Sequence, residues 1–376
     1  MMKKKKIKIA GAGVAGLTSA INLAKADFKV EVYESCQKVG KEQAENPQML
    51  PNWLSQGDVI EELEGCNIKI NWREQIREIE IFLGSGRKIL ISGKKIPVGY
   101  TILRGGDSSL EKSLAQEAEN LGVKIITNFE VKENDLDFDI LATGSSQVLT
   151  LGYGQVFRGR SGFEADKTKV IFDQKLTPSL GYGYFYPWSQ NSAVVKISKR
   201  FDEKISLKES LEKLKKEYLT EDLKGKDFLQ EFFTKRSFQI PNSAKINNSL
   251  LVGERAGFQD QLFRFGIRYA VFSGYFAAKS IIENLDYDKL WKEHFLNEFQ
   301  KIAKLKRIFQ DLKRKNFAVF PEKLEIPIEK IKKVWLSRKI AFLLNFYPLG
   351  PNLIFNIFFK NLFSNFTTGY GKNLLA

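Results

Sequence analysis

Three glycines near the N-terminus and one acidic residue after them form the clearest pattern that could bind a ligand. Gly11, Gly13 and Gly16 make a G-x-G-x-x-G turn between an apolar strand and a helix, and Glu34 ends the next strand. The first glycine permits a tight turn, the second lets the backbone approach a pyrophosphate, and the third lets the helix pack closely. The helix N-terminus offers N–H groups to phosphates, and Glu34 can accept hydrogen bonds from ribose hydroxyls. The pattern predicts a dinucleotide site without distinguishing FAD from NAD, and the acid disfavours NADP.

Few residues could carry catalysis by themselves. The 376-residue chain has one histidine, His294, in a segment typical of an amphipathic helix, and two cysteines, Cys36 and Cys66, outside any zinc-binding spacing. This argues against Ser-His-Asp and Cys-His mechanisms and predicts neither a metal site nor a disulfide framework. Two isolated cysteines fit a reducing cytoplasm. No catalytic residue is identified, and we expect a cofactor to carry any chemistry.

The chain is strongly basic, with a net charge of +15 that is concentrated at residues 3–6 and from Lys289 to Lys333. Such charge can attract nucleic acid, an anionic membrane or an anionic ligand. Nucleic acid is not expected, because the sequence has no zinc-finger, helix-turn-helix or ribonucleoprotein signature. A lysine-rich solvated surface is the simplest interpretation.

Further segments predict elements that would complete the dinucleotide site. A strand ends at Arg104 ahead of a helix, and the apolar strand in DFDILATGSS runs into the small turn Ala142-Thr143-Gly144. Ahead of both, residues 76–93 alternate apolar and polar side chains around a Gly-Ser-Gly turn, which predicts a β-hairpin inserted in the dinucleotide-binding domain.

Two later regions complete the pattern. Residues 154–198 read mostly as strands and predict a separate antiparallel sheet, in which ordinary packing and a substrate pocket explain the aromatic cluster equally well. The cluster comprises Tyr182, Tyr184, Tyr186, Pro187 and Trp188. Residues 250–281 then predict a strand followed by a long apolar helix.

These motifs together resemble the geranylgeranyl reductase family, which has the flavoprotein fold of the aromatic hydroxylases. The resemblance covers about residues 6–282 and rests on the glycine turn with its glutamate, the arginine before a helix, LATG, GYGYFYP, Ile240-Pro241, and VGERAGF followed by FGIRYAVFSGYFAA. It implies a bound FAD. The cofactor-binding residues that it predicts are Gly11, Gly13, Val14, Ala15, Gly16, Glu34, Arg104, Ala142, Thr143, Gly144, Gly253, Glu254, Gly266 and Ile267.

The resemblance also implies roles for individual residues. Arg104 would lie near the phosphate and ribityl portion, and Glu254 would replace the aspartate of the family's GDAAGF motif at the ribityl chain. Gly266 and Ile267 would bring backbone N–H groups to the flavin ring. This chain departs from the family in the longer side chain of Glu254 and in the bulky run QDQLFRFGI, where relatives have several glycines.

The predicted fold is α/β, with a Rossmann-like FAD-binding domain, an antiparallel β-sheet substrate domain and a helical C-terminal region. The expected boundaries are 1–150 and 235–284 for the discontinuous FAD-binding domain, 151–234 for the substrate domain, and 285–376 for the basic helical region.

Three functions remain open from the sequence. The first is reduction of C=C bonds in an isoprenoid or other apolar, lipid-like substrate by hydride transfer from reduced flavin, with NAD(P)H or a ferredoxin-type protein as electron donor. The second is a flavin monooxygenase, and the third is a non-redox, cyclase-like flavoprotein, because one fold supports many reactions.

The C-terminal region also has two interpretations. Residues 338–363 are very apolar but are divided by Pro348, Gly350 and Pro351 into runs too short to span a bilayer. With the basic segment before them, they could bind the inner face of an anionic membrane, or they could close the substrate cavity.

Overall fold

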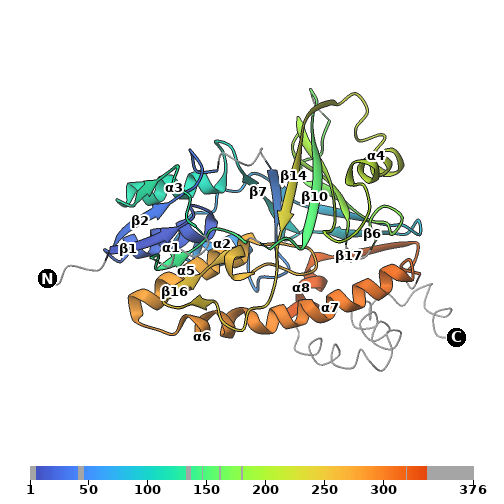
Figure 1. Ribbon diagram of the computed structural model, residues 1–376. Coiled ribbons are helices and arrows are strands. Elements are labelled where there is room, and N and C mark those ends of the chain that lie inside the picture. Colours follow the sequence, from blue (N-terminus) through green and yellow to red (C-terminus); the bar gives the residue numbers. More distant parts are fainter. Residues whose placement is uncertain are drawn as a thin grey trace.

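A parallel β-sheet forms the first part of the molecule. The computed structural model describes residues 6–40, 46–132, 137–145, 147–160, 162–178, 181–318 and 320–336 (Figure 1). One sheet of six strands has the order β15-β16-β9-β1-β2-β8, in which only the edge strand β15 pairs antiparallel to its neighbour. Its strands are β1 (Lys6–Ala10), β2 (Lys29–Tyr33), β8 (Lys124–Ile126), β9 (Ile140–Leu141), β15 (Lys245–Ile246) and β16 (Ser249–Leu251).

Helices cover this sheet and join segments that lie far apart in the sequence. Helix α1 (Val14–Lys25) packs against both α3 (Leu110–Asn120) and α5 (Ile267–Glu283), and every residue from Val14 to Leu23 is buried. At the α1–α5 crossing, Ser19 Oγ donates a hydrogen bond to the Gly274 carbonyl at 2.9 Å. The N-terminal unit and the segment after residue 249 therefore form one Rossmann-like domain with a common core.

A second, larger sheet has eight strands in the order β14-β10-β13-β12-β11-β5-β6-β17. It is mostly antiparallel, with parallel pairs β11–β5 and β6–β17. Helix α4 (Leu207–Tyr218) packs against β10 and β13. The strands are β5 (Glu78–Leu83), β6 (Lys88–Ser92), β10 (Thr150–Arg158), β11 (Lys167–Phe172), β12 (Gly183–Ser189), β13 (Ser192–Arg200), β14 (Asp227–Arg236) and β17 (Lys323–Pro327).

Smaller elements connect the two sheets. A three-stranded antiparallel sheet has the order β3-β7-β4, and helix α7 runs from the Rossmann-like domain toward the large sheet (Figure 1). These elements are β3 (Asn46–Pro51), β4 (Gln75–Ile76), β7 (Gly99–Arg104), α2 (Val59–Glu64), the 3-10 helix η1 (Gly253–Ala256), α6 (Tyr287–Trp291), the π-helix η2 (Lys292–Leu296), α7 (Asn297–Arg314) and α8 (Ile328–Leu336).

The predicted α/β class, the Rossmann-like domain and the antiparallel sheet are confirmed, but two segments lie elsewhere than expected. The hairpin at residues 76–93 forms, as β5 and β6, yet it extends the eight-stranded sheet. The region predicted to be helical from residue 285 contributes β17 to the same sheet. These placements depend on the pairs β5–β11 and β6–β17, whose members are remote in sequence, so local patterning does not indicate them. The division at residues 150, 234 and 284 stays a prediction.

No helix among the described residues is long and apolar enough to cross a membrane. Residues 338–363, for which membrane binding and cavity closure were both considered, lie outside the described residues.

Candidate functional site

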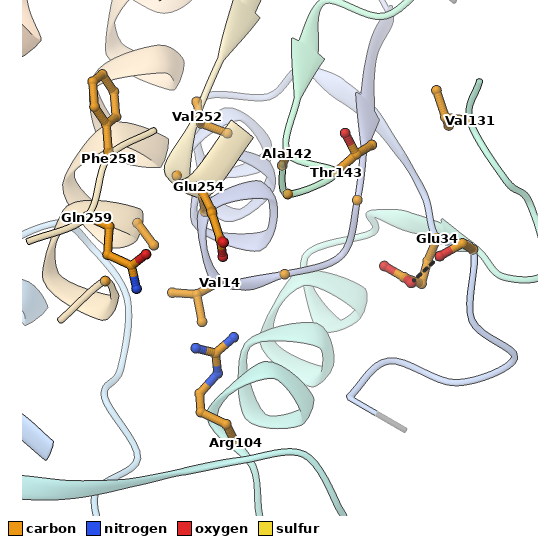
Figure 2. Close-up of a pocket in the computed structure, with 18 of the residues that line it drawn as sticks. Val14, Glu34, Arg104, Val131, Ala142, Thr143, Val252, Glu254, Phe258 and Gln259 are labelled. Atoms are coloured by element: carbon orange, nitrogen blue, oxygen red, sulfur yellow. Dashed lines mark hydrogen bonds between the residues drawn. The ribbon is translucent and has the colours of Figure 1, made fainter. Parts of the chain in front are cut away.

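A polar cavity of about 400 Å³ lies where the glycine turn, the ends of the parallel strands and the start of α5 meet. This edge of a parallel sheet is where α/β folds bind nucleotides. All but Gly16 and Ile267 of the predicted cofactor-binding residues line it (Figure 2). The lining residues that the sequence did not indicate are Tyr33, Ser35, Gln48, Phe129, Glu130, Val131, Arg236, Val252, Phe258, Gln259 and Ala270.

The three glycines of the turn have different roles: two are required for packing, and one leaves an open surface for a ligand. Gly11 has φ +99°, and a Cβ there would lie 2.5 Å from the Ala142 carbonyl oxygen. A Cβ at Gly16 would lie 2.1 Å from the Gly11 carbonyl oxygen, so Gly16 is needed for close packing although it does not line the cavity. A Cβ at Gly13 would meet no atom within 4 Å. Gly13 is thus the position at which a ligand can approach the backbone.

Two helices direct their N-termini at the cavity. Helix α1 follows Gly13 and α5 follows Gly266, and neither has an acidic residue in its first turn or a side-chain cap. The partial positive charge and the first N–H groups of each helix consequently face the cavity without a competing acid in the first turn. Arg104 and Arg236 add positive charge to its lining. The arrangement suits a ligand with a pyrophosphate and a second, electron-rich group.

Glu34 is held at the end of β2. One carboxylate oxygen accepts a hydrogen bond from the Ala12 N–H at 2.8 Å, and the other accepts one from the Cys36 N–H at 3.0 Å and from the Ser35 hydroxyl at 3.2 Å. These contacts fix the carboxylate beside the glycine turn, on the side of the cavity bounded by Val131 (Figure 2). The site thereby presents an acceptor where a ribose would lie.

Glu254 and Arg104 enter the cavity from different elements. Glu254 lies in η1, and its carboxylate accepts a hydrogen bond from the Ser237 N–H at 3.0 Å. Arg104 ends β7, and its Nε donates to the buried carboxylate of Glu111. Figure 2 shows both side chains pointing into the cavity. The extra methylene of Glu254 relative to aspartate is accommodated, because the carboxylate reaches a backbone partner outside η1.

Gln259 is the most informative residue that the sequence reasoning missed. Its Nε2 donates to the Arg264 carbonyl at 2.7 Å, while its Oε1 is buried without a hydrogen-bond partner among the described residues. A buried carbonyl oxygen without a partner is costly unless a ligand supplies a donor. Gln259 opens the run QDQLFRFGI, whose bulk was the signal that this turn is unusual.

That run is an ordered turn. Asp260 is buried, and its carboxylate accepts hydrogen bonds from the N–H groups of Leu262 and Phe263 at 2.5 and 2.9 Å. Burial raises the pKa of Asp260 to about 6. Arg264 has φ +66°, and its guanidinium donates to the Ser198 hydroxyl at 2.7 Å. Polar contacts thus shape the approach to α5 where the related pattern has glycines.

A second cavity, of about 300 Å³ and mostly apolar, adjoins the first. Both are lined by Gln48, Arg236 and Gly266. Ile267, predicted to contact the cofactor, lines this second cavity, together with Tyr182, Tyr184 and Tyr186. Other lining residues include Met49, Trp53, Ile79, Ile81, Ile91, Val170, Phe172, Lys196, Phe263, Arg264 and Phe265.

Pro187 and Trp188, which were also considered as pocket residues, do not line either cavity. Trp188 is 5% exposed and packs in a core cluster with Val194 and Ile79. Their place in the strand explains this, since side chains alternate between faces and β12 carries a register irregularity after Pro187. Both side chains are buried, as ordinary packing of the sheet would place them.

The three tyrosines have distinct environments. The Tyr182 hydroxyl donates to the Phe263 carbonyl at 2.6 Å, and the Tyr186 hydroxyl shares a hydrogen bond of 3.0 Å with Thr101. Burial raises the pKa of all three phenols. They are neutral at physiological pH and form a polar but uncharged edge of an apolar cavity.

Comparisons with known proteins agree with this architecture. The NAD(P)-binding Rossmann-like domain family matches residues 9–47. No curated protein sequence matches the chain significantly. Among solved structures, a geranylgeranyl bacteriochlorophyll reductase-like protein from Thermoplasma acidophilum is 17% identical, with a TM-score of 0.68, covering 95% of this chain and 99% of that one.

Two further structures carry different printed activities. A triple mutant of a flavin-dependent brominase is 13% identical, with a TM-score of 0.61, covering 91% of this chain and 98% of the other. A tetrameric 2-methyl-3-hydroxypyridine-5-carboxylic acid oxygenase is 17% identical, with a TM-score of 0.56 and coverage of 84% and 92%. At these identities the likeness establishes the fold, which hosts several reactions.

Proposed function

We propose that this protein is an FAD-dependent oxidoreductase that acts on an apolar substrate. The observation that carries the proposal is the meeting of the two cavities at Gln48, Arg236 and Gly266. One cavity has the polar features of a dinucleotide site, and the other has an apolar, aromatic lining. A cofactor that extends through the first would place its reactive end beside a substrate in the second.

The residues of the first cavity fit FAD in order along its length. Glu34 would bind the adenosine ribose, and the open surface at Gly13 with the α1 N-terminus would bind the pyrophosphate. Arg104 and Glu254 would contact the phosphate and ribityl portion. The ring would lie at Gly266, where the partnerless Oε1 of Gln259 could accept a hydrogen bond from it.

When bound and reduced, FAD would supply a hydride to the substrate. The N–H groups at the start of α5 would stabilise negative charge at this end of the cavity, by about 0.3–2 kcal/mol through the helix dipole. The apolar walls, including Ile267 and Phe265, would exclude water from the reacting atoms. Tyr184 would present a protonated hydroxyl to the substrate, because burial raises its pKa.

The reaction that we favour is reduction of a C=C bond in an isoprenoid or other lipid-like molecule, with NAD(P)H or a ferredoxin-type protein as the electron donor. It is supported by the apolar cavity and by the resemblance of the motifs to geranylgeranyl reductases. A peripheral position at an anionic membrane would suit such a substrate.

Hydroxylation by a flavin monooxygenase is the second candidate. It is favoured by the shared fold with the hydroxypyridine carboxylic acid oxygenase, since a tyrosine-lined cavity suits an aromatic substrate as well as an isoprenoid.

An anaerobic experiment separates the candidates. FAD-loaded protein is reduced with dithionite. One sample is mixed with a polyprenyl alcohol and a polyprenyl carboxylic acid, and another with air-saturated buffer that contains an aromatic acid. Flavin reoxidation with saturation of the polyprenyl chain supports the reductase. Reoxidation by oxygen with a hydroxylated product supports the monooxygenase, and a substrate altered without flavin reoxidation supports a non-redox role. A protein that cannot be loaded with FAD refutes the proposal.

A further inference from the structure

One charged residue stands out in the apolar cavity. Lys196 lines it from β13, where it pairs with Tyr184 of β12 and Gly154 of β10. Its Nζ lies 5.9 Å from the Tyr184 ring centroid and 5.8 Å from that of Phe232. Among the described residues, no hydrogen bond or ion pair involves this Nζ. Such a group inside an apolar cavity is energetically unfavourable unless a ligand compensates it.

The sequence makes room for this lysine. A Cβ at Gly152 would lie 2.8 Å from Lys196 Cε and 2.5 Å from the Thr234 hydroxyl. A Cβ at Gly154 would lie 2.5 Å from the Phe232 ring. The two glycines of β10 therefore create the space across which the lysine stem and the Phe232 ring lie.

Two arginines line the same cavity, and no aspartate or glutamate does so in the part of the chain that the structure describes. Arg236 ends β14, and Arg264 is held by its hydrogen bond to Ser198 and stands 5.5 Å from the Tyr182 ring centroid. Burial and the positive charges of both arginines hold the pKa of Lys196 well below its ordinary value. An anion among the three would remove this repulsion.

We propose that the second cavity is built for an apolar acid, whose anionic head group binds among Lys196, Arg236 and Arg264 while its apolar body contacts the aromatic walls. This inference rests on the proposed function, because it names the substrate class of the same site. It goes beyond that function in requiring a charge on the substrate. Since Arg236 lines both cavities, the head group would lie near the place where they meet.

Calorimetric titration of the full-length protein tests the charge requirement. The probes are 1-naphthoate, its neutral counterpart 1-naphthamide, and acetate, an anion without an apolar body. We expect naphthoate to bind about tenfold to a hundredfold more tightly than naphthamide, as one charge-assisted hydrogen bond can provide. Acetate should bind far more weakly than naphthoate. Equal binding of naphthoate and naphthamide would overturn the proposal. Acetate binding as tight as that of naphthoate would also overturn it, because the apolar body would then contribute nothing to binding.

Matched variants locate the charge. In Lys196→Met the preference for naphthoate should fall by about tenfold, because only the two arginines remain, whereas Lys196→Arg should keep it. Lys235→Met removes the same charge from an exposed residue next to Arg236 and should leave the preference unchanged. A Lys196→Met protein that keeps the preference would contradict the assignment.

Folding and cofactor binding are measured separately. Because Lys196→Met removes a buried polar group that has no hydrogen-bond partner, its melting temperature should equal or exceed that of the wild type; a clear decrease would contradict the absence of a native partner. FAD content is determined for every sample. If the chain takes up no FAD, the proposed function fails, while the same titration of the cofactor-free chain still decides whether the acid site exists.

Discussion

Substitution of two glycines in the same turn should separate cofactor binding from folding. Gly13 has φ −78° and ψ 177°, which alanine adopts readily, and a Cβ there meets no atom within 4 Å. The reduced freedom of the unfolded chain stabilises Gly13→Ala by about 0.4–1 kcal/mol, while the lower preference of alanine for an N-cap opposes it. We expect the free energy of unfolding to change by less than about 1 kcal/mol.

The same methyl group should weaken FAD binding, because it occupies the surface that the pyrophosphate would approach. Loss of one hydrogen bond to a charged group costs about 1.5–3 kcal/mol, which corresponds to about tenfold to a hundredfold weaker affinity. Gly16→Ala should instead lower the stability of the fold. Its Cβ would lie 2.1 Å from the Gly11 carbonyl oxygen, so α1 must move, and we expect a loss of about 2 kcal/mol or more in stability.

The assay combines urea unfolding of the cofactor-free proteins with titration of flavin fluorescence. The reasoning is refuted if Gly13→Ala binds FAD as tightly as the wild type while it remains fully folded. It is also refuted if Gly16→Ala is as stable as the wild type, because the turn would then tolerate the contact that the structure forbids.

Three further predictions concern other parts of the molecule. Glu254→Asp should bind FAD about tenfold more weakly, because the shorter side chain cannot keep its 3.0 Å hydrogen bond from the Ser237 N–H. Fluorescence titration measures this affinity, and unchanged or tighter binding would show that the glutamate is not fitted to the site. The raised pKa of Asp260, about 6, means that the folded chain binds this proton more tightly than the unfolded chain. The free energy of unfolding should therefore gain up to about 3 kcal/mol from this group as pH falls from 6 toward 4, and lose it as pH rises. Urea unfolding of Asp260→Asn at several pH values should lack this pH-dependent contribution. A pH profile identical to that of the wild type would exclude the role of Asp260. Deletion of residues 337–376 should abolish flotation with liposomes containing anionic lipid, and undiminished flotation would remove these residues from any membrane role.

The parts of the site that the sequence predicted are those encoded locally. The glycine turn, Glu34 and the η1 segment each belong to a short stretch whose residue types are fixed by a strand-to-helix connection. The tight turn is one example, because Gly11 has a φ of +99°, which glycine adopts readily and other residues rarely do. For the same reason, the Rossmann-like unit could be predicted from the sequence, while its domain boundaries stay a prediction.

Two of the missed residues, Gln48 and Arg236, reach the site through long-range pairing. Gln48 lies on β3 opposite Ile102, and Arg236 ends a strand whose register is set by β10. Nothing within a few residues of either one indicates a cavity. Lys196 is placed by pairing across β10, β13 and β12, so its lack of a partner becomes visible only in the folded sheet. β17 was missed because its partner, β6, lies in the first third of the chain.

The central claim is that FAD lies in the polar cavity with its ring at the junction with the apolar one. Its most direct test is a crystal structure of the wild-type protein reconstituted with FAD. We predict electron density that runs from Glu34, past Gly13, to a ring beside Gly266 and Gln259, facing Lys196 and Tyr184 across the junction. Density for the cofactor elsewhere, or a ring separated from the apolar cavity, would contradict the account.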